Sequence, residues 1–313
     1  MSQVQSRHFR ASKFDFWSFF FSGLTGLATL LIVGILAVIL LNIFINGWSS
    51  ISWRFVSTIP TDLFNVKTTG ILPMIVGTTF RVLVMTIFVI PVGVITAIYL
   101  TEYAPSNSLI TRVIRAAVNN LAGVPSIVFG LFGLGFFINF IGKNLDVLLH
   151  NPTTVWGQPA LIWASLTLAV MTVPVVIVAT EESLKAIPPG LREASLALGA
   201  TKLETILKIV LPQALPGIMT GGILAVSRAA GEVAPIMFTG VFTYMVGLPR
   251  KLSDPFMDLA NHVYVLSTQS NNIDETRPIL YATVLVLLVL TFALNIVAII
   301  IRSNIRRKMR SLH

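Results

Sequence analysis

The sequence predicts an all-α polytopic membrane protein, and three observations support this fold class. Apolar side chains make up 55% of the 313 residues and charged side chains 11%, with a mean hydropathy of +0.84. A soluble domain of this size is far less apolar. Six apolar stretches are long enough to cross a bilayer, and the charged side chains gather at the edges of these stretches.

The six predicted membrane spans follow from length, since a helix needs about 20 apolar residues to cross about 30 Å of hydrocarbon. They cover residues 20–45, 74–100, 117–141, 160–180, 214–246 and 279–301. The first is too long for the apolar part of a signal peptide and has no small-residue cleavage site, so we expect a retained anchor. This divides the chain into an N-terminal segment (1–19), a membrane domain (20–301) and a basic tail (302–313).

Two of these spans are long and contain both glycine and proline. The span 117–141 carries Gly123 and Pro125, and the span 214–246 carries Gly231 and Pro235. We expect each of the two to be bent or to include re-entrant backbone that faces protein rather than lipid.

The distribution of cations predicts the orientation. With the N-terminus in the cytoplasm, 14 of the 22 Lys and Arg residues fall in the inner segments 1–19, 101–116, 181–213 and 302–313, and Arg228 lies within a span. The bias places both termini and the segment 181–213 in the cytoplasm. It also makes anionic lipid head groups, and not nucleic acid, the expected partner of the excess positive charge.

The segment 181–213, called the two-helix loop below, first predicts a short helix at 191–198. Pro188-Pro189-Gly190 ends the preceding span, and Pro189 suits the first turn of a helix, where its missing N–H is not needed. Gly199 is expected to adopt the left-handed conformation that closes this helix.

A second short helix follows directly. Thr201 and Glu204 have the spacing of a capping box, in which each side chain bonds the backbone amide of the other residue. We expect this helix to run to about Val210 and to end before Pro212. Its apolar stripe at helical spacing consists of Leu203, Ile206, Leu207 and Val210.

The two-helix loop resembles the signature of ABC importer permeases, E-A-A-x3-G-x9-I-x-L-P, with serine in place of the second alanine. The matching residues are Glu193, Ala194, Ser195, Gly199, Ile209, Leu211 and Pro212. The resemblance implies that these residues couple the chain to a separate ATPase. Without it, the loop would be an amphipathic hairpin lying on lipid head groups.

A charged pair lies inside the fifth predicted span. A lone charge at the bilayer centre costs about 2.5–3.5 kcal/mol, so Arg228 and Glu232, four residues apart on one helical face, are expected to pair. One interpretation is a structural pair that fixes helix orientation. In the other, Arg228 offers a donor fork to a passing oxyanion and Glu232 holds it in place.

Two further stretches resemble the A-type permease of phosphate importers. They are S-R-A-A-G-E-V-A-P at 227–235, where Val233 replaces the usual threonine, and N-L-A-G-V-P-S-I-V-F-G at 120–130. The resemblance implies a phosphate path at Arg228 and Glu232 in the plasma (inner) membrane of a bacterium. It also implies a heterodimer with a second related permease subunit, two ATP-binding subunits and a soluble phosphate-binding protein.

The sequence carries no signature of catalysis. It has no cysteine, four histidines and no G-x4-G-K-[ST] phosphate loop, so we expect no catalytic residue, metal site or cofactor, and ATP hydrolysis on another chain. A permease for molybdate, sulfate or phosphonate stays open as an alternative function, as does a membrane scaffold or sensor that recruits an ATPase.

Arg81 is interpreted as a side chain that snorkels at the outer interface, and Glu102 as a boundary charge.

Overall fold

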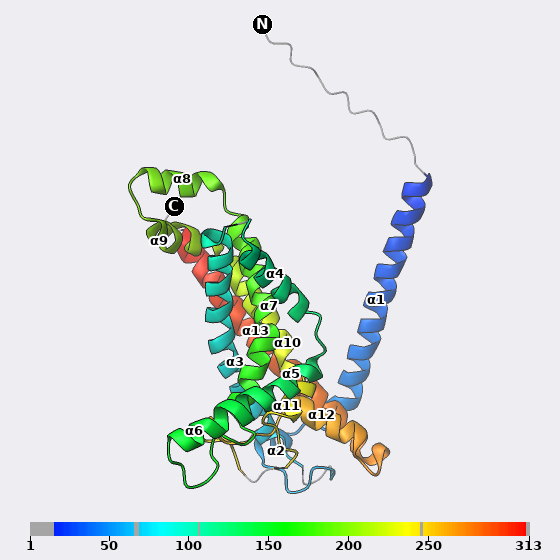
Figure 1. The fold of residues 1–313 in the computed structure, drawn as a ribbon. Coiled ribbons are helices and arrows are strands. Elements are labelled where there is room, and N and C mark those ends of the chain that lie inside the picture. The colour runs from blue at the N-terminus through cyan, green and yellow to red at the C-terminus, as the bar shows by residue number, and fades with distance from the viewer. Residues whose placement is uncertain (1–15, 66–68, 106, 245–246, 311–313) are drawn as a thin grey trace.

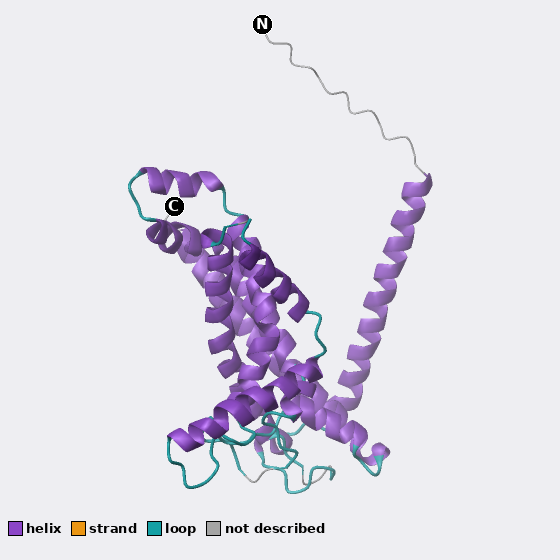
Figure 2. Cartoon of the chain, in the orientation of Figure 1, coloured by secondary structure: helices purple, strands orange, loops and turns teal. Residues whose placement is uncertain are grey.

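A computed structural model describes residues 16–65, 69–105, 107–244 and 247–310. In these ranges the regular elements are helical, apart from an isolated parallel bridge between Val241 and Phe256 (Figure 2). The all-α prediction is therefore confirmed. Arg7, Arg10, Lys13 and Lys67, which enter the charge count, lie outside the described residues.

Six helical segments in the described ranges are long and apolar enough to cross a membrane, as predicted. They consist of α1 (Phe16–Trp48), α3 (Leu72–Ile98) with η1 (Tyr99–Tyr103), α5 (Ser126–Phe132) with η2 (Gly133–Gly142) and α6 (Lys143–Leu148), α7 (Leu161–Lys185), α9 (Lys202–Thr205) with η3 (Ile206–Val210) and α10 (Leu211–Ala230), and α13 (Ile273–Arg310). The segments η1 to η3 are π-helical. The other helices are α2 (Trp53–Ser57), α4 (Leu109–Leu121), α8 (Pro189–Ala197), α11 (Ala234–Met237) and α12 (Leu259–Thr268).

Helix α7 forms the centre of the bundle, because it packs against both α3 and α10. Glycines permit the close approach: a Cβ at Gly93 would lie 2.6 Å from the Val176 side chain, and one at Gly221 would lie 2.7 Å from Ala179 Cβ. Small residues at such contacts are how helices pack closely within a membrane, where no hydrophobic effect drives them together.

Helix α1 stands apart from the bundle along most of its length (Figure 1). It packs against α13, with Gly47 close to the Tyr281 carbonyl, and none of its most apolar window is buried. Its apolar surface is therefore left for lipid or for another protein chain.

The third and fifth predicted spans have the right location but the wrong ends. The third helix is broken after Leu121, and its spanning part begins at Ser126, because Pro125 interrupts the helical path. The fifth span begins earlier, at Lys202, and α10 ends at Ala230, so residues 231–246 leave the spanning helix and include the short α11. Each of the two predicted spans thus contains an interruption of its helix, at 122–125 and after Ala230.

The two-helix loop lies at one end of the molecule. Figure 1 shows α8 and α9 at the end where α1 begins and α13 terminates, whereas α2, α6 and α12 lie at the opposite end. The start of α1, the end of α13 and the two-helix loop therefore lie at the same end of the molecule.

Candidate functional site

Helix α10 ends at Ala230, inside the bundle, where Ala229 and Ala230 are buried. Its last carbonyls contact Arg81, which lies nine residues after Leu72, the first residue of α3. At a rise of 1.5 Å per residue, Arg81 lies about 14 Å along α3 from Leu72. Ala229 and Ala230 are buried, so their carbonyl groups need hydrogen-bond donors from the protein.

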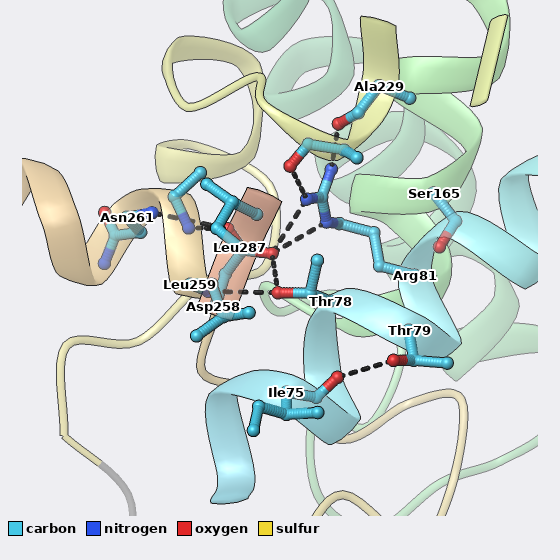
Figure 3. Close-up of polar contacts among 12 residues, drawn as sticks. Ile75, Thr78, Thr79, Arg81, Ser165, Ala229, Asp258, Leu259, Asn261 and Leu287 are labelled. Atoms are coloured by element: carbon cyan, nitrogen blue, oxygen red, sulfur yellow. Dashed lines mark hydrogen bonds and ion pairs between the residues drawn. The ribbon is translucent and has the colours of Figure 1, made fainter. Parts of the chain in front are cut away.

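Arg81 supplies these donors (Figure 3). Its Nη1 donates to the carbonyl of Ala229 at 2.8 Å and its Nη2 to that of Ala230 at 3.3 Å. Nε and Nη2 pair with Asp258 at 3.0 and 2.8 Å, and the hydroxyl of Thr78 donates to the same carboxylate at 2.9 Å. The other carboxylate oxygen caps the first turn of α12. Both charged side chains are 0% exposed.

The interpretation of Arg81 as a snorkelling side chain at the outer interface is therefore wrong. Arg81 is fully buried, because its guanidinium compensates both a buried carboxylate and the carbonyls at the end of a helix. The partner Asp258 lies 177 residues further on, in a polar segment between two spans, so hydropathy alone does not connect the two residues.

Arg228 and Glu232 lie beside this network and are accessible. Their side chains pair as predicted, with 3.5 Å between Arg228 Nε and Glu232 Oε1, and are 41% and 21% exposed. Glu232 lies just beyond the end of α10, and its amide donates to the Ala229 carbonyl at 3.3 Å. Within the described residues, Glu232 is the only side-chain partner of the Arg228 guanidinium, so the Nη end can bind another acceptor.

A polar contact next to Arg228 joins α10 to α13. The hydroxyl of Ser227 lies 3.0 Å from Oδ1 of Asn295, a half-buried amide in an otherwise apolar stretch of the last span. Sequence reasoning gave this span no role beyond its length. The signal that could have shown it is a lone polar side chain at membrane depth.

The turn of the two-helix loop has the predicted local structure. Gly199 has φ +87°, in the left-handed region, and Thr201 and Glu204 form the reciprocal capping box. A hydrogen bond of 2.9 Å between the hydroxyls of Ser195 and Thr205 joins α8 to α9. The serine that departs from the family signature therefore contributes a contact that alanine could not make.

The prediction that the second short helix ends before Pro212 is wrong. Helix α9 continues through η3 into α10 without a break. The π-helical segment η3 ends at Val210, where the Leu211 amide donates to the Ile206 carbonyl, and Pro212 lies in the first turn of α10. Ile209, Leu211 and Pro212 are half-buried in this continuous helix, whereas Glu193, Ala194 and Gly199 are exposed.

Both helices of the loop are fixed to the end of η1. Arg192 of α8 bonds Glu102 at 2.8 Å and also donates to the carbonyls of Leu184 and Ile187. Lys202 of α9 lies 4.9 Å from the ring centroid of Tyr103. Glu102 is thus more than a boundary charge, because it connects the loop to the span that contains α3.

We expect the Glu102–Arg192 contact to stabilise the loop measurably. Glu102→Gln and Arg192→Gln should each destabilise the protein by about 1.5–3 kcal/mol, the range for hydrogen bonds to charged groups, because the side chains are only 9% and 21% exposed. Thermal unfolding of both single variants and the double variant in detergent gives the coupling energy. Purely additive effects would contradict a direct contribution of the pair.

In the ranges that the structure describes, no group of three or more His, Cys, Asp or Glu side chains could hold a metal ion. The chemistry of the site rests on a buried cation, Arg81, that fixes backbone, and an accessible cation, Arg228, that can meet an anion.

The fold resembles that of ABC transporter chains among solved structures. Among solved structures, the inward-facing MetNI methionine ABC transporter matches 74% of this chain and 94% of its own, with a TM-score of 0.55 and 20% identity. A bacterial alginate ABC transporter matches 90% of this chain and 92% of its own, with a TM-score of 0.60 and 14% identity. At these identities the likeness concerns the fold.

The sequence comparisons give the family. The profile of the family described as "binding-protein-dependent transport system inner membrane component" matches residues 89–311. The chain belongs to this family and is a multi-pass permease component of an ABC transport system.

Two curated relatives have the same sequence identity to this chain. "Probable ABC transporter permease protein YqgI" of Bacillus subtilis (strain 168) is 32% identical over 79% of this chain and 82% of its own length. "Phosphate transport system permease protein PstA 1" of Mycobacterium tuberculosis (strain ATCC 25618 / H37Rv) is 32% identical over 77% of this chain and 72% of its own.

Proposed function

We propose that this chain is the translocation subunit of a phosphate importer and carries no catalytic residue of its own. The observation that supports this most directly is Arg228, a cation in the last turn of the spanning helix α10 whose side chain is 41% exposed. A guanidinium binds a tetrahedral oxyanion through two parallel N–H groups, and the neighbouring carboxylate weakens the positive site enough for release. Relatives named as phosphate permeases indicate the substrate.

The site needs a second subunit. A charge with this exposure would be unstable against lipid, so a facing protein surface is expected to enclose the path. Relatives include both A-type and C-type phosphate permeases by name. The proposed complex therefore contains a second related permease, two ATP-binding subunits and a soluble phosphate-binding protein.

The two-helix loop is proposed as the contact with the ATPase. Its exposed residues Glu193, Ala194 and Gly199 would meet the partner, and Ser195 would hold the two helices together. Ile209, Leu211 and Pro212 lie in the continuous helix that leads to Arg228, so we assign to them the transmission of motion.

The cation bias supports a location in the bacterial plasma membrane with both termini in the cytoplasm. The segments 1–19 and 302–313, which precede and follow the membrane domain 20–301 in the sequence, would then both face the cytoplasm. The two-helix loop would face the same side, because it lies at the end where α1 begins and α13 terminates (Figure 1).

Reconstitution of the complete complex tests the proposed substrate. In proteoliposomes with the ATPase, the second permease and the loaded binding protein, phosphate should stimulate ATP hydrolysis and accumulate inside. Stimulation by molybdate, sulfate or phosphonate in place of phosphate would assign another oxyanion. The absence of flux with all four would favour a scaffold or sensor that recruits the ATPase.

A further inference from the structure

Arg81 cannot itself meet a transported ion, because its side chain is 0% exposed and its contacts lie within the protein. It nevertheless lies next to the accessible pair. Its Nη1 and Nη2 donate to the carbonyls of Ala229 and Ala230, which directly follow Arg228 in the chain.

The carbonyl of Ala229 connects the buried Arg81 to the turn that holds Glu232. The Ala229 oxygen accepts from Arg81 Nη1 at 2.8 Å and from the amide of Glu232 at 3.3 Å. It also accepts the amide of Gly231, so the turn that leaves α10 is organised around this one atom. A shift of the guanidinium would therefore move the turn that brings Glu232 back to Arg228.

We propose that Arg81 is a positioning residue for the anion path, and that its guanidinium sets the relative placement of Arg228 and Glu232 through the carbonyls at the end of α10. This inference rests on the proposed function. Asp258 fixes the guanidinium from the opposite side and at the same time caps α12. The planar fork of arginine matches this arrangement of one carboxylate and two carbonyls, and a lysine ammonium does not.

A purely structural ion pair would predict something different. In that case any substitution at Arg81 would lower stability and disturb the bundle as a whole. A positioning role predicts that the loss is concentrated at the turn 231–232 and in the affinity for the transported ion.

Hydrogen exchange in the assembled complex tests the placement without any substrate. Arg81→Lys keeps the charge opposite Asp258 and should accelerate exchange of the Gly231 and Glu232 amides about tenfold. The double variant Arg81→Gln/Asp258→Asn removes both buried charges and should give the same local effect. The control Ile279→Ala opens a cavity in the hydrophobic cluster that Ile279 forms with Phe55 and Leu266, and should leave these two amides within about twofold of the wild type.

Transport kinetics provide the second measurement. Arg81→Lys should raise the phosphate KM about tenfold with a smaller change in kcat, whereas Ile279→Ala at equal loss of Tm should leave KM unchanged. Unchanged exchange and unchanged KM in Arg81→Lys, or equal changes in the control, would overturn the inference. If the wild-type complex transports no phosphate, the proposed function fails, while the exchange experiment still decides the role of Arg81.

Discussion

Replacement of Arg228 by alanine is expected to abolish phosphate uptake while the complex still assembles. The variant removes a guanidinium that can donate two charge-assisted hydrogen bonds to an oxyanion, worth about 1.5–3 kcal/mol each. A loss of about 3 kcal/mol corresponds to about two powers of ten in affinity or rate. The effect on folding should be small, because the side chain is 41% exposed and its contact with Glu232 is long, at 3.5 Å.

Uptake of labelled phosphate into proteoliposomes, together with co-purification of the partner subunits, measures the two effects separately. Arg228→Lys keeps the charge but not the planar fork, and should retain a small part of the uptake. Arg307→Ala removes an exposed cation from the last turns of α13 and serves as the matched control, with normal uptake expected. Normal uptake by Arg228→Ala would remove Arg228 from the proposed path.

Replacement of Gly199 by proline is expected to uncouple the chain from its ATPase. The native φ of +87° is inaccessible to proline, whose ring fixes φ near −65°, and the Gly199 amide that donates to the Leu196 carbonyl at 3.0 Å is lost. The cost of about 3 kcal/mol or more falls on the single turn that joins α8 to α9. The exposed residues on either side would then lose their mutual orientation.

The measurement is co-purification of the ATPase with the permease, followed by ATPase activity in the presence of substrate. Gly190→Ala provides a matched glycine control within α8, because Gly190 has open space around it and an ordinary φ. This control should bind the ATPase normally. Undiminished binding and stimulation with Gly199→Pro would show that the loop is not the docking element.

The parts of the structure that the sequence predicts well are those controlled by neighbouring residues. The φ of Gly199 and the capping box of Thr201 and Glu204 depend on spacings of a few residues, so local rules suffice. The number of spans depends on composition, which a bilayer constrains strongly. The Arg228–Glu232 pair belongs to the same group, because its spacing of four residues is local.

The sequence predicts poorly the contacts between residues that are far apart in the chain. It also predicts poorly the helix ends that lie within a longer apolar stretch. Arg81 and Asp258 are 177 residues apart, and Glu102 and Arg192 are 90 apart, so only the packed bundle brings them together. The ends of the third and fifth spans were misplaced because apolar residues continue past the helix breaks. Pro212 predicts a helix end, whereas the helix continues through it, and the π-helical turn before it leaves no simple pattern in the sequence.

The unbroken passage from α9 through η3 into α10 makes the 29 residues Lys202–Ala230 one continuous helical segment. At 1.5 Å per residue it is about 43 Å long, so a tilt of about 10° about its Ala230 end displaces its other end, at the two-helix loop, by about 7 Å. Conversely, a movement of several ångströms imposed at the two-helix loop would rotate the helix near Arg228 by a small angle and translate it very little. Such a rotation would change the orientation of the Arg228 guanidinium by a small angle and leave its position almost unchanged.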